Sequence, residues 1–301
     1  MKIDIALCTD EHFVIPALAS ITSIFENNKD DECCITVLTS GLSSSAINKF
    51  AQLAKYYNRE ICVKIISNSF FEGMITLKRY PLSMYFRFLL PKVLNDAERV
   101  LYLDCDTIIR GSLRKLYQTN LYKKACAVVV DQQCDDVLII NRLRISSPYF
   151  NSGVLLLNLD YWRKNDISNC LISYIHNNSN TCIYPDQDAL NVILEGKVTY
   201  LPYKYNYQEM WATMRLQTRI HYSKWSKIEE ASLNPIIVHY CVDVKPWFIE
   251  CKNPYRDEFL CYALKHSFVG FKRKKKYGWL YHWLVAWEMR FHRWSLKYIR
   301  S

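Results

Sequence analysis

Short apolar runs alternate with longer amphipathic segments along the first 250 residues of the chain. The runs typical of buried strands lie at residues 3–7, 33–40, 61–67, 99–103, 125–130, 153–159 and 235–240. Between the first of them, residues 13–28 and 44–58 repeat apolar side chains at helical spacing. Strands that alternate with helices predict an α/β fold: a Rossmann-like, mostly parallel central sheet with helices on both faces.

Composition favours one large core. Half of the 301 residues are hydrophobic and 14% are aromatic, so we expect one main domain plus an appendage. The 12 cysteines are scattered among apolar residues and form no C-x-x-C pair, which indicates reduced packing residues. The first residues lack the features of a secretory signal, and no window reaches the roughly eighteen uncharged apolar residues of a membrane span. We therefore expect a cytoplasmic protein.

Positive charge is concentrated near the C-terminus. The net charge is +10, and residues 270–301 hold nine Lys or Arg against Glu288 as their single acidic residue. The rest of the chain is nearly neutral, so the charge gives no general nucleic-acid signal. This predicts a main domain over residues 1–250 and a distinct basic segment over residues 251–301.

Two carboxylates, Asp104 and Asp106, directly follow the apolar run at residues 99–103. In open α/β sheets, ligands bind beyond the carboxyl ends of the strands. Spacing of i and i+2 in extended chain puts both carboxylates on one side, where they repel each other unless a cation lies between them. Oxygen ligands suit Mg²⁺ or Mn²⁺. The alternative is that both are ordinary turn or capping residues.

Other polar residues occupy comparable positions. Asn151 and Ser152 precede Gly153 and a predicted strand, where they suit a polyhydroxy ligand. Asp186, Gln187 and Asp188 lie at a predicted helix start, and we expect one of the three to act only as a cap. His239 follows a predicted strand and Lys245 lies six residues later, so they are candidates for a third metal ligand and for a phosphate-binding cation. A satisfied core or surface histidine is the alternative for His239.

Taken together, these motifs resemble family 8 glycosyltransferases, in particular the bacterial galactosyl- and glucosyltransferases that build lipooligosaccharide and lipopolysaccharide cores. The resemblance covers about residues 1–250, in family order and at family distances. It rests on "ALCTDEHF", "SMYFRFLLP", "RVLYLDCDTIIRGSL", "YFNSGVLLLNLDYWR", "YPDQDALN" and "HYCVDVKPW".

The resemblance implies a GT-A fold, a donor that is UDP-galactose or UDP-glucose, Mn²⁺ with Mg²⁺ as the alternative, and a lipid-linked oligosaccharide acceptor. It also assigns roles. The implied metal ligands are Asp104, Asp106 and His239. The implied contacts to the UDP-sugar are Cys8, Thr9, Asp10, His12, Phe13, Arg87, Asp104, Cys105, Asp106, Asn151, Ser152, Asp186, Gln187 and Lys245. Ordinary loop positions remain the alternative for His12 and Phe13, and a plain ion pair for Arg87.

The resemblance further implies that the anomeric configuration is retained. Retention needs either a protein nucleophile on the opposite face of the sugar or attack from the face that UDP leaves. Gln187 has the family position nearest that opposite face but is a weak nucleophile, whereas Asp186 and Asp188 are stronger candidates. We favour same-face attack, in which the leaving phosphate helps to deprotonate the acceptor hydroxyl. Metal and Lys245 neutralise the departing UDP.

One position departs visibly from the family pattern. Val242 stands where relatives commonly have glycine, and a positive φ there would strain a β-branched residue. Ser152, where relatives often have alanine, is a milder change. Val242 keeps open a membrane-associated UDP-sugar-binding protein with an impaired site. Another metal-dependent nucleotide-processing enzyme, such as a nucleotidyltransferase or phosphatase, is the second alternative.

The basic segment carries a tryptophan stripe. Trp279, Trp283, Trp287 and Trp294 fall within about an 80° arc at 100° per residue, beyond the basic cluster at residues 272–276. This predicts a helix on an anionic membrane surface through residues 270–301, at the inner face of the cytoplasmic membrane. A helix packed on the catalytic domain is the alternative. RNA binding has no recognised fold to support it, so we expect no nucleic-acid partner. We also expect that residues after about 265 serve localisation only.

Overall fold

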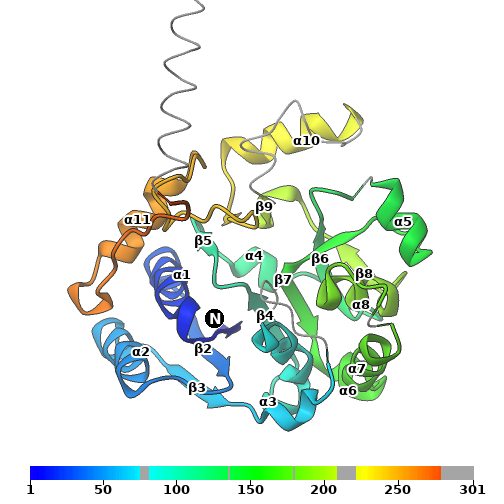
Figure 1. Ribbon diagram of the computed structural model, residues 1–301, viewed down its shortest axis with the longest axis horizontal. Coiled ribbons are helices and arrows are strands. Elements are labelled where there is room, and N and C mark those ends of the chain that lie inside the picture. Colours follow the sequence, from blue (N-terminus) through cyan, green and yellow to red (C-terminus); the bar gives the residue numbers. More distant parts are fainter. Residues whose placement is uncertain (75–80, 135, 179, 209–221, 279–301) are drawn as a thin grey trace, which may run out of the picture.

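The computed structural model describes residues 1–74, 81–134, 136–178, 180–208 and 222–278. Its main sheet, within these residues, has seven strands (Figure 1). Their order is β3 (Ile61–Ile65), β2 (Glu32–Thr39), β1 (Lys2–Cys8), β4 (Arg99–Leu103), β7 (Phe150–Asn158), β6 (Cys126–Val130) and β8 (Val198–Tyr200). All pairs are parallel except those of β7, which runs antiparallel to both β4 and β6. The predicted mostly parallel α/β sheet is confirmed.

After β4, the chain enters a small second sheet. It contains β5 (Thr107–Ile109), β10 (Ile237–His239) and β9 (Tyr207–Gln208). The predicted strand near residues 235–240 therefore belongs to this sheet and not to the main one. β5 starts directly after Asp106, and its antiparallel pairing puts His239 opposite Thr107. This register carries the distant His239 to the turn that holds Asp104 and Asp106.

Helices cover both faces of the main sheet. Alternate residues of β1, such as Ile3 and Ile5, pack in one cluster with α1 (Val14–Asn27) and α2 (Ser44–Tyr57), while Ala6 packs in the opposite cluster. That opposite cluster contains α6 (Leu159–Lys164), α7 (Ile167–Asn177) and α8 (Pro185–Ile193). Two-sided burial explains the nearly continuous apolar runs of these strands.

Shorter elements connect these layers. The remaining α-helices are α3 (Leu90–Val93), α4 (Arg114–Tyr117), α5 (Val137–Leu143), α10 (Tyr222–Leu233) and α11 (Arg256–Leu264). The 3₁₀-helices are η1 (Glu11–Phe13), η2 (Asn68–Phe71), η3 (Leu82–Leu89), η4 (Tyr203–Tyr205) and η5 (Ser267–Val269). None of the described helices is long and apolar enough to cross a membrane.

The described part of the C-terminal segment, residues 251–278, packs on the main body. Phe259 of α11 is fully buried in a cluster with Tyr240. The basic cluster (residues 272–276) runs beside residues 247–249: Lys274 N donates to Trp247 O at 3.0 Å, and Ile249 N donates to Lys274 O at 2.9 Å. The tryptophan stripe at residues 279–294 lies outside the described residues, so the membrane helix stays a prediction.

Candidate active site

A cavity of about 610 Å³ opens beyond the carboxyl ends of β1 and β4. Most residues that sequence analysis selected line this cavity. They are Cys8, Thr9, Asp10, Phe13, Arg87, Asp104, Cys105, Asp106, Asn151, Ser152, Asp186, Gln187, His239 and Lys245. His12 and Asp188 are selected residues that do not line it.

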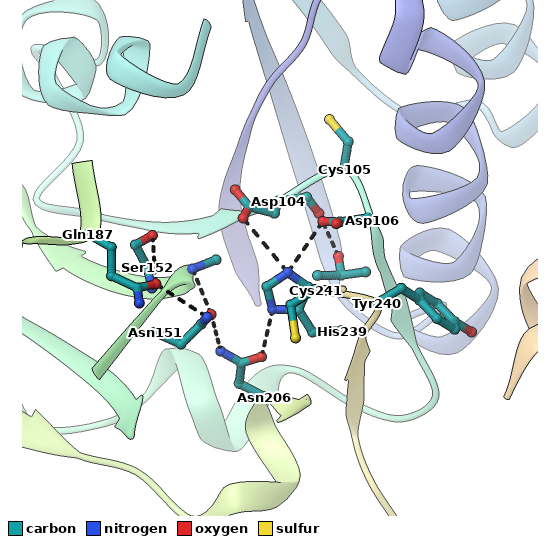
Figure 2. A network of polar contacts seen from close by, with 12 residues as sticks. Asp104, Cys105, Asp106, Asn151, Ser152, Gln187, Asn206, His239, Tyr240 and Cys241 are labelled. Atoms are coloured by element: carbon teal, nitrogen blue, oxygen red, sulfur yellow. Dashed lines mark hydrogen bonds and ion pairs between the residues drawn. The ribbon is translucent and has the colours of Figure 1, made fainter. Parts of the chain in front are cut away.

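Asp104, Asp106 and His239 converge in the cavity (Figure 2). His239 Nε2 lies 3.3 Å from Asp106 Oδ1 and 3.8 Å from Asp104 Oδ2. One candidate ligand atom from each residue lies within 4.8 Å of the others. Two carboxylates and an imidazole form a donor set that fits a divalent cation. We call these three residues the candidate metal centre.

Gly153 permits this convergence. A Cβ atom at residue 153 would lie 2.3 Å from His239 Cε1 and 2.7 Å from Asp104 Oδ2. The backbone of β7 is tied to the turn as well, because Asp104 N donates to Gly153 O at 2.8 Å. Any side chain would therefore displace two of the three candidate ligands.

Lys245 closes one side of the candidate metal centre. Its Nζ lies 2.6 Å from Asp106 Oδ2 and donates to Tyr240 O at 2.6 Å. Burial raises the pKa of the Asp106 carboxyl, but the positive charge of Lys245 and the contact with His239 outweigh it and hold that pKa well below its usual range. Asp106 is therefore an anion that already faces a cation, Lys245.

Val242 does not strain the loop that carries Lys245. Among the described residues, the non-glycine residues with positive φ are Asn58, Lys123, Arg144 and Asp166. Val242 is outside that set, so its backbone adopts a conformation open to β-branched residues. The strain that would argue for an impaired site is absent at this residue.

Arg87 links two acidic residues of the cavity. Its side chain is only 5% exposed, and its guanidinium lies 3.1 Å from Asp104 Oδ1 and 3.4 Å from Asp186 Oδ2. It also donates to Ser152 O at 2.6 Å and stacks over the ring of Tyr102 at 4.3 Å. Arg87 therefore fixes Asp104 relative to α8 and neutralises part of the acidic charge.

Asp186 and Gln187 face the cavity from the first turn of α8. Asp186 Oδ2 accepts from Ser152 Oγ at 3.1 Å, and Gln187 Oε1 accepts from Ser152 N at 2.9 Å. Burial raises the pKa of Asp186, while the charge of Arg87 lowers it in part. Both side chains are thus held by β7 at the edge of the cavity.

Asp188 points away from the cavity and is fully buried. Its carboxylate binds Arg142 through contacts of 2.8 and 3.2 Å and accepts from Tyr149 Oη at 2.7 Å. It also accepts from the backbone N–H groups of Ile183 and Tyr184, at 2.9 and 3.1 Å. Asp188 therefore holds the backbone that leads into α8, and its place outside the cavity argues against a role as nucleophile.

His12 and Phe13, both in η1, have side chains in different surroundings. Asp10 Oδ1 accepts from the backbone N–H groups of both residues, at 2.9 and 3.1 Å. The side chain of Phe13 reaches the cavity and meets Trp247 edge to face, with ring centroids 5.6 Å apart. His12 is exposed outside the cavity, which fits the ordinary-loop interpretation.

Three residues around the centre were not predicted from the sequence: Tyr102, Asp131 and Asn206. Asp131 directly follows β6, so the rule that selected Asp104 also selects it. Burial raises the pKa of Asp131, and it accepts from Asn151 Nδ2 at 3.0 Å and Gln187 Nε2 at 3.2 Å. Tyr102 Oη donates to Asp104 Oδ1 at 2.6 Å. Asn206, which is fully buried between η4 and β9, carries no sequence signal.

The fold and this cavity define an α/β enzyme with a candidate divalent-metal centre. The chain belongs to glycosyl transferase family 8, whose family model matches residues 4–251. The enzyme class predicted from the sequence, a glycosyltransferase, is confirmed.

Individual relatives agree with this family. General stress protein A of Bacillus subtilis is 26% identical over 263 residues, which cover 86% of this chain and 92% of that protein. The lipopolysaccharide 1,3-galactosyltransferase of Salmonella typhimurium is 27% identical over 298 residues, which cover 89% of this chain and 86% of that protein. The crystal structure of galactosyltransferase LgtC with donor and acceptor sugar analogs superposes with a TM-score of 0.79 at 24% identity, over 87% of this chain and 96% of LgtC. This likeness confirms the GT-A fold.

Proposed function

We propose that the protein is a retaining hexosyltransferase that moves galactose or glucose from a UDP-sugar to a lipid-linked saccharide of a lipopolysaccharide or lipooligosaccharide core, or a similar surface glycan. The observation that carries the proposal is the convergence of Asp104, Asp106 and His239 beside Lys245. Similarity to the Salmonella galactosyltransferase and to the lipopolysaccharide glucosyltransferase WaaO of Escherichia coli, 28% identical over 276 residues, supports the acceptor class.

Asp104, Asp106 and His239 would hold Mn²⁺, with Mg²⁺ as the alternative. When bound, the cation supplies positive charge that neutralises the diphosphate of the donor. Lys245 adds a second positive charge at the same end of the cavity. Because its Nζ binds Asp106 at 2.6 Å, Lys245 is placed to exchange this carboxylate for a donor phosphate.

The two ends of the cavity suit the two parts of the donor. We assign the nucleoside to the end formed by Cys8, Thr9, Asp10 and Phe13, with Cys105 between the two ligand carboxylates. Arg87, Asn151, Ser152, Asp186 and Gln187 form the sugar end. Galactose and glucose differ only at C4, so the orientation of Asp186 and Gln187 would decide between them.

Same-face attack remains the preferred mechanism. Gln187 Oε1 accepts from Ser152 N, and Gln187 Nε2 donates to Asp131 at 3.2 Å. An amide held at both ends is a poor nucleophile, which supports departure and attack on one face of the sugar. In this mechanism the leaving phosphate receives the proton of the acceptor hydroxyl.

We also propose that the protein works at the inner face of the cytoplasmic membrane. Residues 272–275 of the basic cluster are exposed, and each basic residue near an anionic leaflet contributes about 1 kcal/mol of binding free energy. A lipid-linked acceptor is confined to that surface, so docking raises its effective concentration.

Manganese-dependent release of UDP from UDP-galactose or UDP-glucose tests the proposed activity. We expect release by the wild type and its loss in Asp106→Ala, and product masses then identify the sugar transferred. No release from any of several UDP-sugars would favour the sugar-nucleotide-binding alternative. Release of pyrophosphate or inorganic phosphate in place of UDP would favour another nucleotide-processing enzyme.

A further inference from the structure

A chain of buried amides lies beneath the candidate metal centre. It links Asp131 through Asn151 and Asn206 to the ring of His239 (Figure 2 shows the last three). Asn151 is 6% exposed, Asn206 is fully buried and His239 is 3% exposed. These polar groups have little access to water, so their hydrogen bonds are satisfied mainly by other groups of the protein.

The hydrogen bonds of Asn151 fix the orientation of its side-chain amide. Gly153 N lies 2.9 Å from the side chain of Asn151, and a backbone N–H can only donate. The atom of Asn151 that it meets is therefore Oδ1. The remaining atom, Nδ2, lies 3.0 Å from Asp131 Oδ2 and donates to it. Both neighbours of Asn151 thus require the same orientation of its amide.

This orientation determines that of Asn206. The atom of Asn206 that lies 2.9 Å from Asn151 Oδ1 must be a donor, so it is Nδ2. The other atom, Oδ1, therefore lies 3.1 Å from His239 Nδ1 and can only accept. His239 Nδ1 must carry a hydrogen. In a neutral ring, Nε2 then keeps its lone pair and points it at Asp104 and Asp106.

We propose that Asn206 is a positioning residue that prepares His239 to bind the divalent cation. The proposal rests on the metal centre of the proposed function. Without an acceptor at Nδ1, the neutral ring would place its hydrogen on Nε2 and donate it to Asp106, only 3.3 Å away. That arrangement blocks the ligand atom. Asn206 holds the hydrogen on the far nitrogen and fixes the plane of the ring.

Replacement of Asn206 by leucine tests the proposal, because leucine has a similar volume but no acceptor. We expect Asn206→Leu to bind Mn²⁺ about 10- to 100-fold more weakly. The electron paramagnetic resonance signal of free Mn²⁺, in the absence of any sugar nucleotide, measures this affinity. Asn206→Asp keeps an acceptor at Nδ1 and should recover part of the affinity.

A second readout needs no metal. In metal-free protein with ¹⁵N-labelled histidine, in alkaline buffer, we expect His239 to carry its hydrogen on Nδ1 in the wild type and on Nε2 in Asn206→Leu. A wild-type ring that carries hydrogen on Nε2 alone would overturn the proposal, as would an unchanged Mn²⁺ affinity in Asn206→Leu.

Asn28→Leu is the matched control. Asn28 is also buried, and its side chain bonds Ile24 O at 2.9 Å and Leu113 N at 2.8 Å, away from the cavity. Both leucine variants should lose stability, but only Asn206→Leu should change metal binding. Equal Mn²⁺ affinity in wild type and Asp106→Ala would overturn the metal centre itself, while the histidine spectrum would still decide the role of Asn206.

Discussion

Gly153 shows how one absent side chain sets the geometry of the candidate metal centre. We expect Gly153→Ala to lower the rate of UDP release by on the order of 100-fold or more, because its Cβ would displace His239 and Asp104 together. Steady-state rates at saturating Mn²⁺ measure the effect. Gly278→Ala is the control, since nothing lies within 4 Å of a Cβ at that residue. Equal losses in both variants would contradict this explanation.

Glu26 provides a residue-scale test of stability against pH. Its carboxylate accepts from Lys265 Nζ at 2.8 Å and Tyr57 Oη at 2.6 Å, and these partners lower its pKa from 4.5 to about 2. The stabilisation is therefore complete above pH 4.5 and is lost as pH falls toward 2.

We expect Glu26→Gln to lower the free energy of unfolding by about 1 kcal/mol at neutral pH, since it removes the charge that binds Lys265. Urea titrations between neutral pH and pH 3 measure the difference, which should shrink as the medium becomes more acidic. A difference that stays constant across this range would show that the charge of Glu26 is not its cause.

Residues differ in how far the sequence can predict them. Asp104 directly follows β4, Asp106 lies two residues later and His239 is the last residue of β10, so the rule for ligands at strand ends selects them. Asn206 escapes that rule because it reaches His239 only through the pairing of β9 with β10. Asp188 looks identical to Asp186 in sequence. The two separate only because successive residues of a helix point to different sides.

At the scale of elements, α8 depends on Asp188 for its first turn. We expect Asp188→Asn to lower the free energy of unfolding by about 3 kcal/mol, because it leaves the charge of Arg142 without its buried partner. UDP release per folded molecule should persist, since Asp188 does not line the cavity. Thermal unfolding and initial rates on the same samples measure both effects.

Asp160→Asn is the matched control for this helix variant. Asp160 pairs with Arg163 at 2.6 Å, but its side chain is 62% exposed, so the change should alter stability by less than about 0.5 kcal/mol. A folded Asp188→Asn protein as inactive as Asp106→Ala would return Asp188 to the candidate nucleophiles.

Element types are well predicted here, and sheet membership is not. Each predicted apolar run forms a strand, and for most of them burial on both faces leaves a continuous hydrophobic signal. The exception is β3, which lies at the edge of the sheet and is only partly buried. The run at residues 235–240 has the same signal but joins the small sheet. Its partner, β5, is only three residues long, which is too short to give a recognisable strand pattern in the sequence.

At the scale of the whole molecule, the described part of the C-terminal segment packs on the catalytic body. Val269 of η5 is 1% exposed and belongs to the core cluster that contains α1 and α2. Lys276 Nζ donates to Asp243 O at 2.6 Å, within the loop that leads to Lys245. These contacts favour a supporting role for residues 266–276 over the expectation that everything after residue 265 serves localisation alone.

Two truncations separate these roles. Ending the chain after Gly278 should leave UDP release in detergent unchanged, because every contact described between the C-terminal segment and the body remains. Binding to anionic vesicles should weaken, since four basic residues and the tryptophan stripe are removed.

Ending the chain after Lys265 should instead destabilise the body and raise the KM for the donor. This truncation removes burial of Val269, worth about 1.5 to 3 kcal/mol, and several hydrogen bonds worth about 1 kcal/mol each. It also removes the contact from Lys276 that holds the loop before Lys245, so the phosphate end of the cavity loses support. Vesicle flotation, thermal unfolding and donor kinetics on both proteins measure these effects. If the protein that ends after Gly278 also released UDP slowly in detergent, the transfer chemistry would depend on residues 279–301. The two roles would then not be separable at Gly278.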